Sequence, residues 1–403
     1  AGYLELLQAA RPCVIAALQA DWPGPVVVVC ARPEDARHLA DQVQAWSQDP
    51  QKVLHFQAPD AIFYDRVPWD RSTLQARVNV LSSLAALRSY QAQDAGRGLV
   101  ITVSGWALMV KSVSSMAFER AVRTLQVGDW LPPYRLLEYC VQAGYEPVAV
   151  VEEPGTFCHR GSIVDVFPPN LPEPLRIDFF GDEIDSIRVF RPGSQRSRRR
   201  ITEATLAPAS EAIPEWGKAA RYALEAIDLS NCDQTTRLAI SEERGKLVQG
   251  ERCEGIEYYL PYLCPRPSTL LEFLPAHALV LLDDVIGLEA SIASLAEQAL
   301  ALRAGMVDEG KLPSNFAVPY FAWEEIRLRL ASRQALCIGH GPDVDEVTSS
   351  LGRATFMPAP KYAGRLQDLL ADVAELRGKD HRVVLISRQA ERLSDLLRDW
   401  DVY

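Results

Sequence analysis

The sequence predicts a multi-domain α/β protein: a parallel α/β domain with an inserted small antiparallel β domain, followed by a second small α/β domain. In residues 1–121, apolar runs alternate with amphipathic helical stretches, a pattern typical of a parallel sheet covered on both faces. Residues 157–196 instead show the period-two alternation of antiparallel strands. At 403 residues the chain is also too long for one ordinary core.

We expect four consecutive segments. Residues 1–121 and 208–318 form the two parts of the parallel α/β domain, and residues 122–207 form the inserted β domain. Residues 319–403 form the small α/β domain, after a stretch from Met306 to Tyr320 whose two prolines and glycine suit a linker.

The first segment carries strong local signals. Continuous apolar runs at Pro25–Cys30 and Gly98–Val103 suit buried parallel strands, and Val53–Phe56 is a shorter one. A helix opens at Pro33, and its apolar side chains share one face: Ala36, Leu39, Ala40 and Val43. Ser72 to Gln75 resembles a capping box at the start of the next helix.

The inserted segment is predicted to be a β-meander. A helix from Pro133 to Ala143 ends at Gly144. The alternating strands that follow are Ser162–Phe167, Leu175–Phe179 and Ile184–Phe190, after a first strand near Phe157 and separated by Pro, Asn and Gly turns. Such a sheet buries one face and exposes a charged one, which favours docking over catalysis. Adjacent Phe179 and Phe180 point to opposite sides, so only one can be buried.

The third and last segments are also predicted to contain helices and strands. The third segment is predicted to contain helices at Trp216–Ile227, Thr235–Val248 and Gly287–Ala304, and a strand at Ala278–Leu282. The last segment alternates helices with strands. Its helices are Trp323–Leu330, Arg365–Leu376 and Gln389–Trp400, and its strands are Ala335–Ile338, Ala354–Met357 and Arg382–Ser387.

The amino-acid composition narrows the range of possible functions. A net charge of −11 argues against nucleic-acid binding over the whole surface, because phosphate contacts need clustered Lys and Arg. The densest basic cluster is a solvated loop or an anion or DNA contact: Arg196, Arg198, Arg199 and Arg200. Eight scattered cysteines indicate reduced, buried thiols, and six dispersed histidines indicate no metal site. No uninterrupted apolar run approaches the roughly 20 residues of a membrane helix, so we expect a cytoplasmic protein without a membrane partner.

The α/β pattern calls for a search for a phosphate loop. Such a loop needs GxxxxGK followed by Ser or Thr, and the four Gly-Lys pairs here are followed by Ala, Leu, Leu and Asp. No GxGxxG opens a helix after a strand. Asp283-Asp284 is either an acidic magnesium-binding strand end or a helix cap. We therefore expect a degenerate P-loop-like domain, with no ATP hydrolysis and no cofactor.

The meander is recognisable at the level of residues. Phe157–Pro168 reads FCHRGSIVDVFP and Leu175–Ile184 reads LRIDFFGDEI. Both resemble the domain shared by UvrB and the bacterial transcription-repair coupling factors (Mfd), and the stretches Gly255–Pro261 and Leu271–Pro275 agree. Where UvrB has its phosphate loop, this chain has Ala9-Ala10-Arg11-Pro12, which favours the coupling factors.

The resemblance implies a function. The chain would be the N-terminal module of a coupling factor, recruiting UvrA to damage-stalled RNA polymerase for nucleotide excision repair. The positions that match UvrA-contacting residues are Arg160, Arg176 and Phe180. Parts absent here would bind RNA polymerase and translocate along DNA, using ATP. The alternative hypothesis is a degenerate NTPase or helicase-like domain that still binds nucleotide or DNA.

Overall fold

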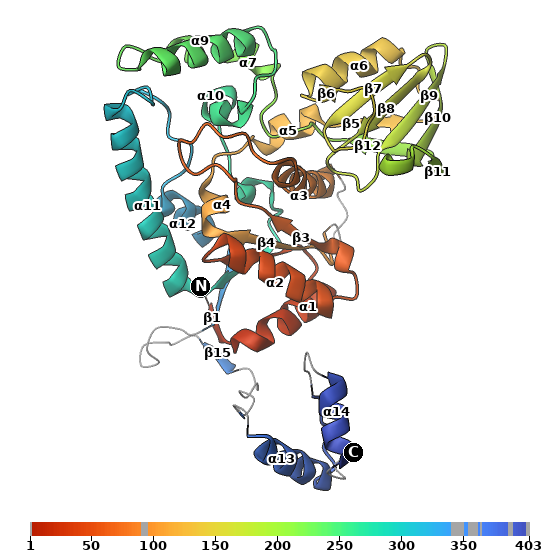
Figure 1. Ribbon diagram of the computed structural model, residues 1–403, viewed down its shortest axis with the longest axis vertical. Coiled ribbons are helices and arrows are strands. Elements are labelled where there is room, and N and C mark those ends of the chain that lie inside the picture. Colours follow the sequence, from red (N-terminus) through yellow and green to blue (C-terminus); the bar gives the residue numbers. More distant parts are fainter. Residues whose placement is uncertain are drawn as a thin grey trace. The chain divides into compact units, whose positions relative to one another are not determined.

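The structure is a computed structural model that describes residues 2–89, 96–339, 350–353, 362, 365–385 and 390–399. The chain divides into two compact units, Ala1–Ala354 and Thr355–Tyr403. The first unit contains a seven-stranded sheet, a six-stranded sheet and a two-stranded sheet (Figure 1). The predicted fold class is confirmed.

The seven-stranded sheet is parallel throughout, in the order β15-β1-β14-β13-β2-β4-β3. Its strands are β1 (Gly2–Glu5), β2 (Val26–Cys30), β3 (Val53–Phe56), β4 (Val100–Ser104), β13 (Leu279–Asp283), β14 (Gln334–Ile338) and β15 (Ser350–Arg353). Alternate residues of β2 enter different cores: Val26 and Val28 pack in one cluster, and Val27 and Val29 in another. Both faces are therefore covered, as the apolar runs predict.

Helices supply the two covering layers. On one face lie α1 (Arg11–Asp21) and α2 (Pro33–Trp46), and the four predicted apolar positions of α2 are all buried. The other face is covered by α3 (Arg71–Ser89), α4 (Gly105–Met109), α11 (Val285–Asp308) and α12 (Trp323–Ala331). The periodicity of α2 thus identifies its buried face correctly.

A fully buried ion pair joins the third segment to this core. The guanidinium of Arg77 on α3 pairs with the carboxylate of Glu211, which also accepts a hydrogen bond from Ser112. Arg77 is 0% exposed and stacks over Phe56, 4.0 Å from the ring centroid. The segment continues through η4 (Ile256–Tyr259), η5 (Leu270–Phe273) and four helices: α7 (Trp216–Ala219), α8 (Arg221–Glu225), α9 (Gln234–Val248) and α10 (Leu260–Leu263).

Three sequence-based expectations need correction. The helix predicted to start at a Ser72 capping box begins at Arg71, and Thr73 instead donates to the carboxylate of Asp60 over 2.7 Å. The single helix predicted over Trp216–Ile227 is two short helices, α7 and α8. β14, expected in the last domain, lies in the large sheet because it pairs with both β13 and β1.

One helix has the length and apolarity needed to cross a membrane. α11 has a mean hydropathy of 1.4 over its most apolar window, of which 17% is buried. This is weak evidence by itself, and the helix packs its buried residues Leu288, Ile292 and Ala299 into the main core. A scan for uninterrupted apolar runs overlooks it because Glu289 and Glu297 interrupt the sequence.

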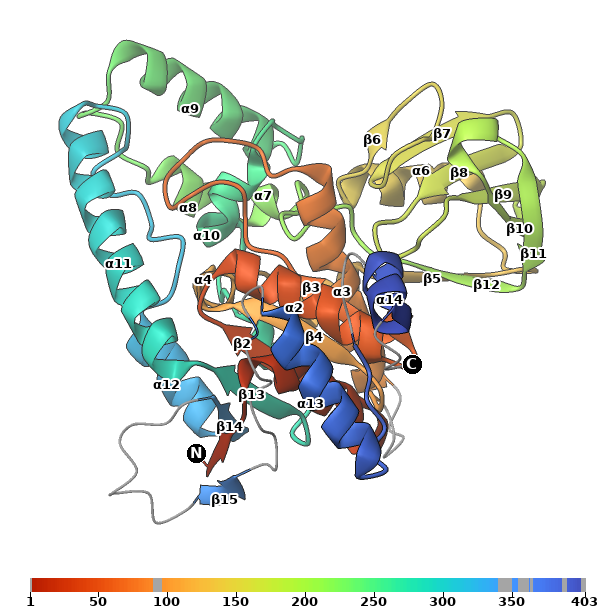
Figure 2. The same cartoon turned by 60° about the horizontal axis from the view of Figure 1, so that its bottom comes forward.

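The β domain is inserted after α5 (Ser115–Ala121). It holds a two-stranded sheet of β5 (Arg123–Gln126) and β12 (Glu203–Leu206), the helix α6 (Pro133–Gln142), and the six-stranded sheet β11-β10-β9-β8-β7-β6. Those strands are β6 (Glu146–Pro147), β7 (Thr156–Arg160), β8 (Ile163–Phe167), β9 (Leu175–Phe180), β10 (Glu183–Phe190) and β11 (Ser197–Ile201). The turned view shows this sheet beside the parallel one (Figure 2). The predicted meander is confirmed.

In the second unit, the described residues form α13 (Leu366–Gly378) and α14 (Ala390–Asp399). Both helices were expected within two residues of these bounds. The strand expected at Ala354–Met357 lies outside the described residues. Of the strand expected at Arg382–Ser387, residues 382–385 have no regular structure and the last two lie outside the described residues.

Candidate docking face

One face of the six-stranded sheet packs into the domain core. The other face is exposed at Arg160 and Phe180, but it is covered where Cys158, Phe167 and Phe190 pack with Val151. Ile177 and Phe179 of β9 enter the domain core with Val164, Val166 and Leu136 of α6. The alternate residues of β9, which are Arg176, Asp178 and Phe180, therefore point to the opposite side. We call that side the outer face and define it by these cross-strand partners on β7 to β11: Cys158, Arg160, Ile163, Asp165, Arg176, Asp178, Phe180, Glu183, Ser186, Arg188 and Arg200.

Phe180 is the exposed member of the phenylalanine pair. Its side chain is 83% exposed, whereas Phe179 is 6% exposed in the core. Phe180 is the last residue of β9, and the two-residue turn Gly181-Asp182 follows. Gly181 has φ +64°, which glycine adopts without a Cβ clash. The tight turn thus presents a large apolar ring to solvent at the end of the sheet.

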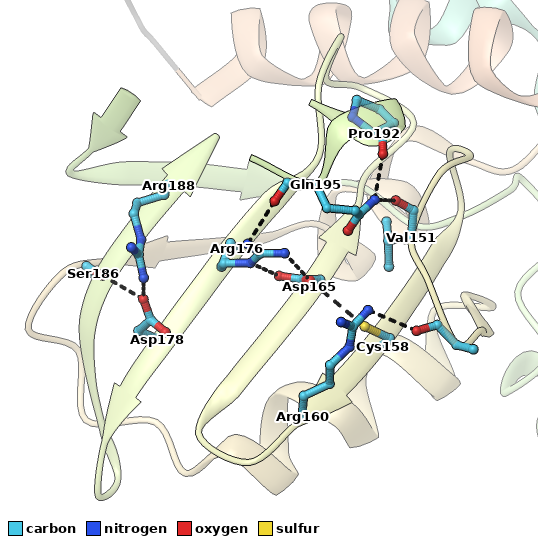
Figure 3. Close-up of polar contacts among 11 residues, drawn as sticks. Val151, Cys158, Arg160, Asp165, Arg176, Asp178, Ser186, Arg188, Pro192 and Gln195 are labelled. Carbon is cyan, nitrogen blue, oxygen red and sulfur yellow. Dashed lines mark hydrogen bonds and ion pairs between the residues drawn. The ribbon is translucent and has the colours of Figure 1, made fainter. Parts of the chain in front are cut away.

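Arg176 is held in place by a buried carboxylate (Figure 3). Its Nε and Nη2 donate to the two oxygens of Asp165, over 2.7 and 2.8 Å, and its Nη1 donates to the carbonyl of Gln195 over 3.1 Å. Asp165 is 2% exposed, and its hydrogen bonds raise the pKa of Arg176. The guanidinium also stacks over Phe190, with 4.7 Å to the ring centroid.

Arg160 is placed differently. It ends β7, beside the Gly161-Ser162 turn, and its side chain is exposed. One guanidinium nitrogen donates to the carbonyl of Ala149 over 3.0 Å, in the segment between β6 and β7 (Figure 3). The turns after β7 and β9 lie at the same end of the meander, so Arg160 and Phe180 share that end while Arg176 lies further along.

Charged residues continue across the sheet as a ladder. Register pairs Asp165 with Arg176, Arg176 with Arg188, and Arg188 with Arg200. Arg188 forms an ion pair with Asp178, which also accepts a hydrogen bond from Ser186 over 3.2 Å. Sequence reasoning missed Asp165 and Arg188. The register places both on the face of Arg176, and in β10 this depends on an irregularity between Ile184 and Ser186 that a strict period of two does not predict.

The predicted basic cluster does not form one patch. All four arginines are exposed. Arg199 pairs in register with Val189, and Arg200 with Arg188, so they point to opposite sides of β11. Arg198 pairs with Glu173 over 2.8 Å. Of Arg196 and these three, the register assigns only Arg200 to the outer face.

Asp283 and Asp284, at the end of β13, have different roles. Asp284 caps α11, because its side chain accepts from the amide of Gly287 over 3.2 Å, which agrees with the cap alternative. Asp283 instead forms an ion pair with the buried Arg11 at the start of α1. Burial raises the pKa of Asp283 to about 6, and Arg11 opposes that rise. Among the described residues no group of three His, Cys, Asp or Glu could hold a metal ion.

Comparison with known proteins agrees with this architecture. Residues 124–211 match the UvrB interaction domain, a range that contains the whole outer face. A transcription-repair-coupling factor of Myxococcus xanthus is 30% identical over 96% of this chain and 32% of its own length. The chain is an Mfd-like module.

Two further relatives mark the extent of the likeness. The coupling factor of Bacillus subtilis is 27% identical to the Mfd-like module, over 69% of this chain and 25% of the relative. The UvrABC system protein B of Pseudomonas aeruginosa is 26% identical, over 73% of this chain and 50% of the relative. The Mfd-like module thus spans a quarter to a third of the coupling factors and about half of that UvrABC system protein B.

Proposed function

We propose that this chain is a non-catalytic docking module that binds UvrA through the outer face of its β domain. As the N-terminal part of a transcription-repair coupling factor in the cytoplasm, it recruits UvrA to damage-stalled RNA polymerase for nucleotide excision repair. The observation that carries the proposal is the 83% exposure of Phe180, on the face that bears Arg160 and Arg176, within the residues that match the UvrB interaction domain.

The chemistry of the face supports a protein partner. Exposed large aromatic side chains flanked by arginines are the residues that dominate binding energy in protein interfaces. Arg160 offers an exposed guanidinium that can pair with a carboxylate, and Phe180 adds apolar area next to it. Arg176 contributes mainly by fixing the sheet surface, because the carboxylate of Asp165 already takes two of its nitrogens.

The ion pair at the end of β13 supports the non-catalytic part. A magnesium-binding carboxylate at a strand end needs to be free for the ion and its waters. Asp283 is instead paired with Arg11, whose side chain is 10% exposed. A cation from the chain itself thus satisfies the carboxylate.

The direct test measures binding to purified UvrA. Calorimetry compares the wild-type chain with Phe180→Ala and Arg160→Ala, and Tyr222→Ala serves as the control because Tyr222 is 86% exposed on α8, outside the matched range. We expect each outer-face variant to weaken binding about tenfold and the control to match the wild type. Unchanged affinity in the Phe180→Ala, Arg160→Ala double variant refutes the docking face.

Titration with ATP tests the competing enzymatic reading. A chain whose strand-end carboxylate is neutralised from within should give no heat signal with ATP and magnesium at micromolar concentrations. Saturable micromolar binding contradicts the non-catalytic assignment and favours a retained nucleotide site.

A further inference from the structure

A second exposed aromatic side chain lies next to the outer face. Trp130, in the segment between β5 and α6, is 75% exposed and forms an antiparallel bridge with Glu183. The backbone amide of Leu131 donates to the backbone carbonyl of Asp182 over 2.7 Å, and the amide of Ile184 donates to the carbonyl of Asp129 over 3.0 Å. These bonds flank the bridge, so Trp130 and Glu183 are a non-hydrogen-bonded pair, the geometry that brings cross-strand side chains closest together.

Glu183 has Phe180 as its partner on the other side. The register of β9 and β10 places Glu183 opposite Phe180, and directly opposed residues share a face of the sheet. Phe180, Glu183 and Trp130 therefore form one row across three neighbouring backbone segments, which we call the aromatic row. The exposed residue Glu183 is thus the middle member of the row, between two exposed aromatic residues.

The charge next to the aromatic row is negative, although Arg160 lies at the same end of the sheet, on β7. Asp129 and Asp182 flank the row in sequence and carry further negative charge. The ladder further along the sheet carries Arg176, Arg188 and Arg200. Arg176 and Arg188 already pair with Asp165 and Asp178. A partner that covers the aromatic row therefore meets local negative charge there, which favours a positively charged group.

The chemistry of the row selects a cation. The faces of aromatic rings attract a guanidinium or ammonium group within about 6 Å, and a carboxylate between two rings adds a hydrogen-bonding counter-ion. Two neighbouring strands are about 4.8 Å apart, so rings on the first and third segments leave room above the middle residue for one flat side chain. Arginine fits best, because its planar group both stacks and pairs bidentately.

We propose that the aromatic row of Phe180, Glu183 and Trp130 binds an arginine or lysine side chain of UvrA. This inference rests on the proposed function and adds to it a specificity-determining contact. Trp130 becomes a binding residue contributed by the segment before α6, and Glu183 becomes its counter-ion. The row is not a DNA contact, because its own charge is negative.

Charge reversal at Glu183 gives the decisive test. Binding of purified UvrA is measured for Trp130→Ala, Glu183→Gln and Glu183→Lys, with Trp46→Ala and Asp185→Asn as exposed controls of the same residue type or charge. We expect about tenfold weaker binding for Trp130→Ala, a smaller loss for Glu183→Gln and the largest loss for Glu183→Lys. Tighter binding by Glu183→Lys, or unchanged affinity of Trp130→Ala, overturns the proposal.

The two proposals fail in different ways. If the wild-type chain does not bind UvrA, the proposed function fails. If UvrA binds and Phe180→Ala weakens it while Trp130→Ala and Glu183→Lys do not, only the aromatic row fails. A test without UvrA follows the indole N–H signal of Trp130, assigned with Trp130→Phe, during titration with N-acetylarginine amide. A shift absent with the neutral citrulline analogue supports the row, and equal responses to both compounds overturn it.

Discussion

Arg176 and Asp165 lie opposite each other on neighbouring strands and form a two-point ion pair whose carboxylate is 2% exposed. The pair lies on the face proposed to bind a partner, yet the hydrogen bonds of Arg176 go to Asp165 and Gln195 within the chain. Its first role is therefore to keep the surface of β8 and β9 in shape. A substitution there changes folding and binding together, which the next experiments separate.

Arg176→Ala is expected to lower the free energy of unfolding by about 3 kcal/mol, because it leaves a buried carboxylate without its partner. Urea denaturation measures the loss. Arg160→Ala, whose side chain is exposed, should stay within about 0.5 kcal/mol of the wild type. If Arg176→Ala is as stable as Arg160→Ala, the Asp165 pair does not support the fold.

The two adjacent phenylalanines should behave in opposite ways. Phe179→Ala removes a ring that is 6% exposed in the domain core and is expected to cost about 3–5 kcal/mol of stability. Phe180→Ala removes a ring that is 83% exposed and should leave stability nearly unchanged while weakening UvrA binding. Thermal unfolding and calorimetry of both variants check this, and a destabilised Phe180→Ala would speak against the assignment of faces.

Arg199 and Arg200 are neighbours on β11 and provide a test variant with its own control. Arg200 shares the outer face with Arg188, whereas Arg199 points to the other side of the sheet. Arg200→Ala is expected to weaken UvrA binding a few-fold and more so at low salt, because an exposed charge is screened by ions. Arg199→Ala should have no effect. An equal loss in both variants would indicate a general charge effect or a DNA contact by the cluster that includes Arg196 and Arg198.

The pairing of Asp283 predicts a pH dependence of stability. Burial raises the pKa of Asp283 to about 6 in the folded chain. Between about pH 4 and pH 6 the folded state therefore holds a proton that the unfolded state has lost, so the free energy of unfolding falls as the pH rises, by up to about 3 kcal/mol. Above pH 6 this contribution is constant.

Asp283→Asn should remove that slope, whatever its effect on stability at a single pH. Urea unfolding of both proteins at intervals from pH 4 to pH 7 gives the difference curve. A difference that does not change with pH would mean that Arg11 keeps the carboxylate ionised throughout.

Local periodicity determined much of this protein. Apolar spacing identified the buried face of α2, and period-two alternation identified the strands β8 to β10 and showed that Phe179 and Phe180 point apart. Such patterns are readable because side-chain direction follows from the backbone repeat of 3.6 or 2 residues. The motifs of the meander also indicated the family that comparison then supported.

Only the tertiary structure decided which phenylalanine is buried, which charges pair, and which distant segments meet. Arg11 and Asp283 form an ion pair although 272 positions separate them. Trp130 and Glu183 are paired by an antiparallel β-bridge that no local sequence pattern predicts. The physical reason is that the facing of a strand is set by what covers it, and pairing across segments depends on the register of chains far apart in sequence.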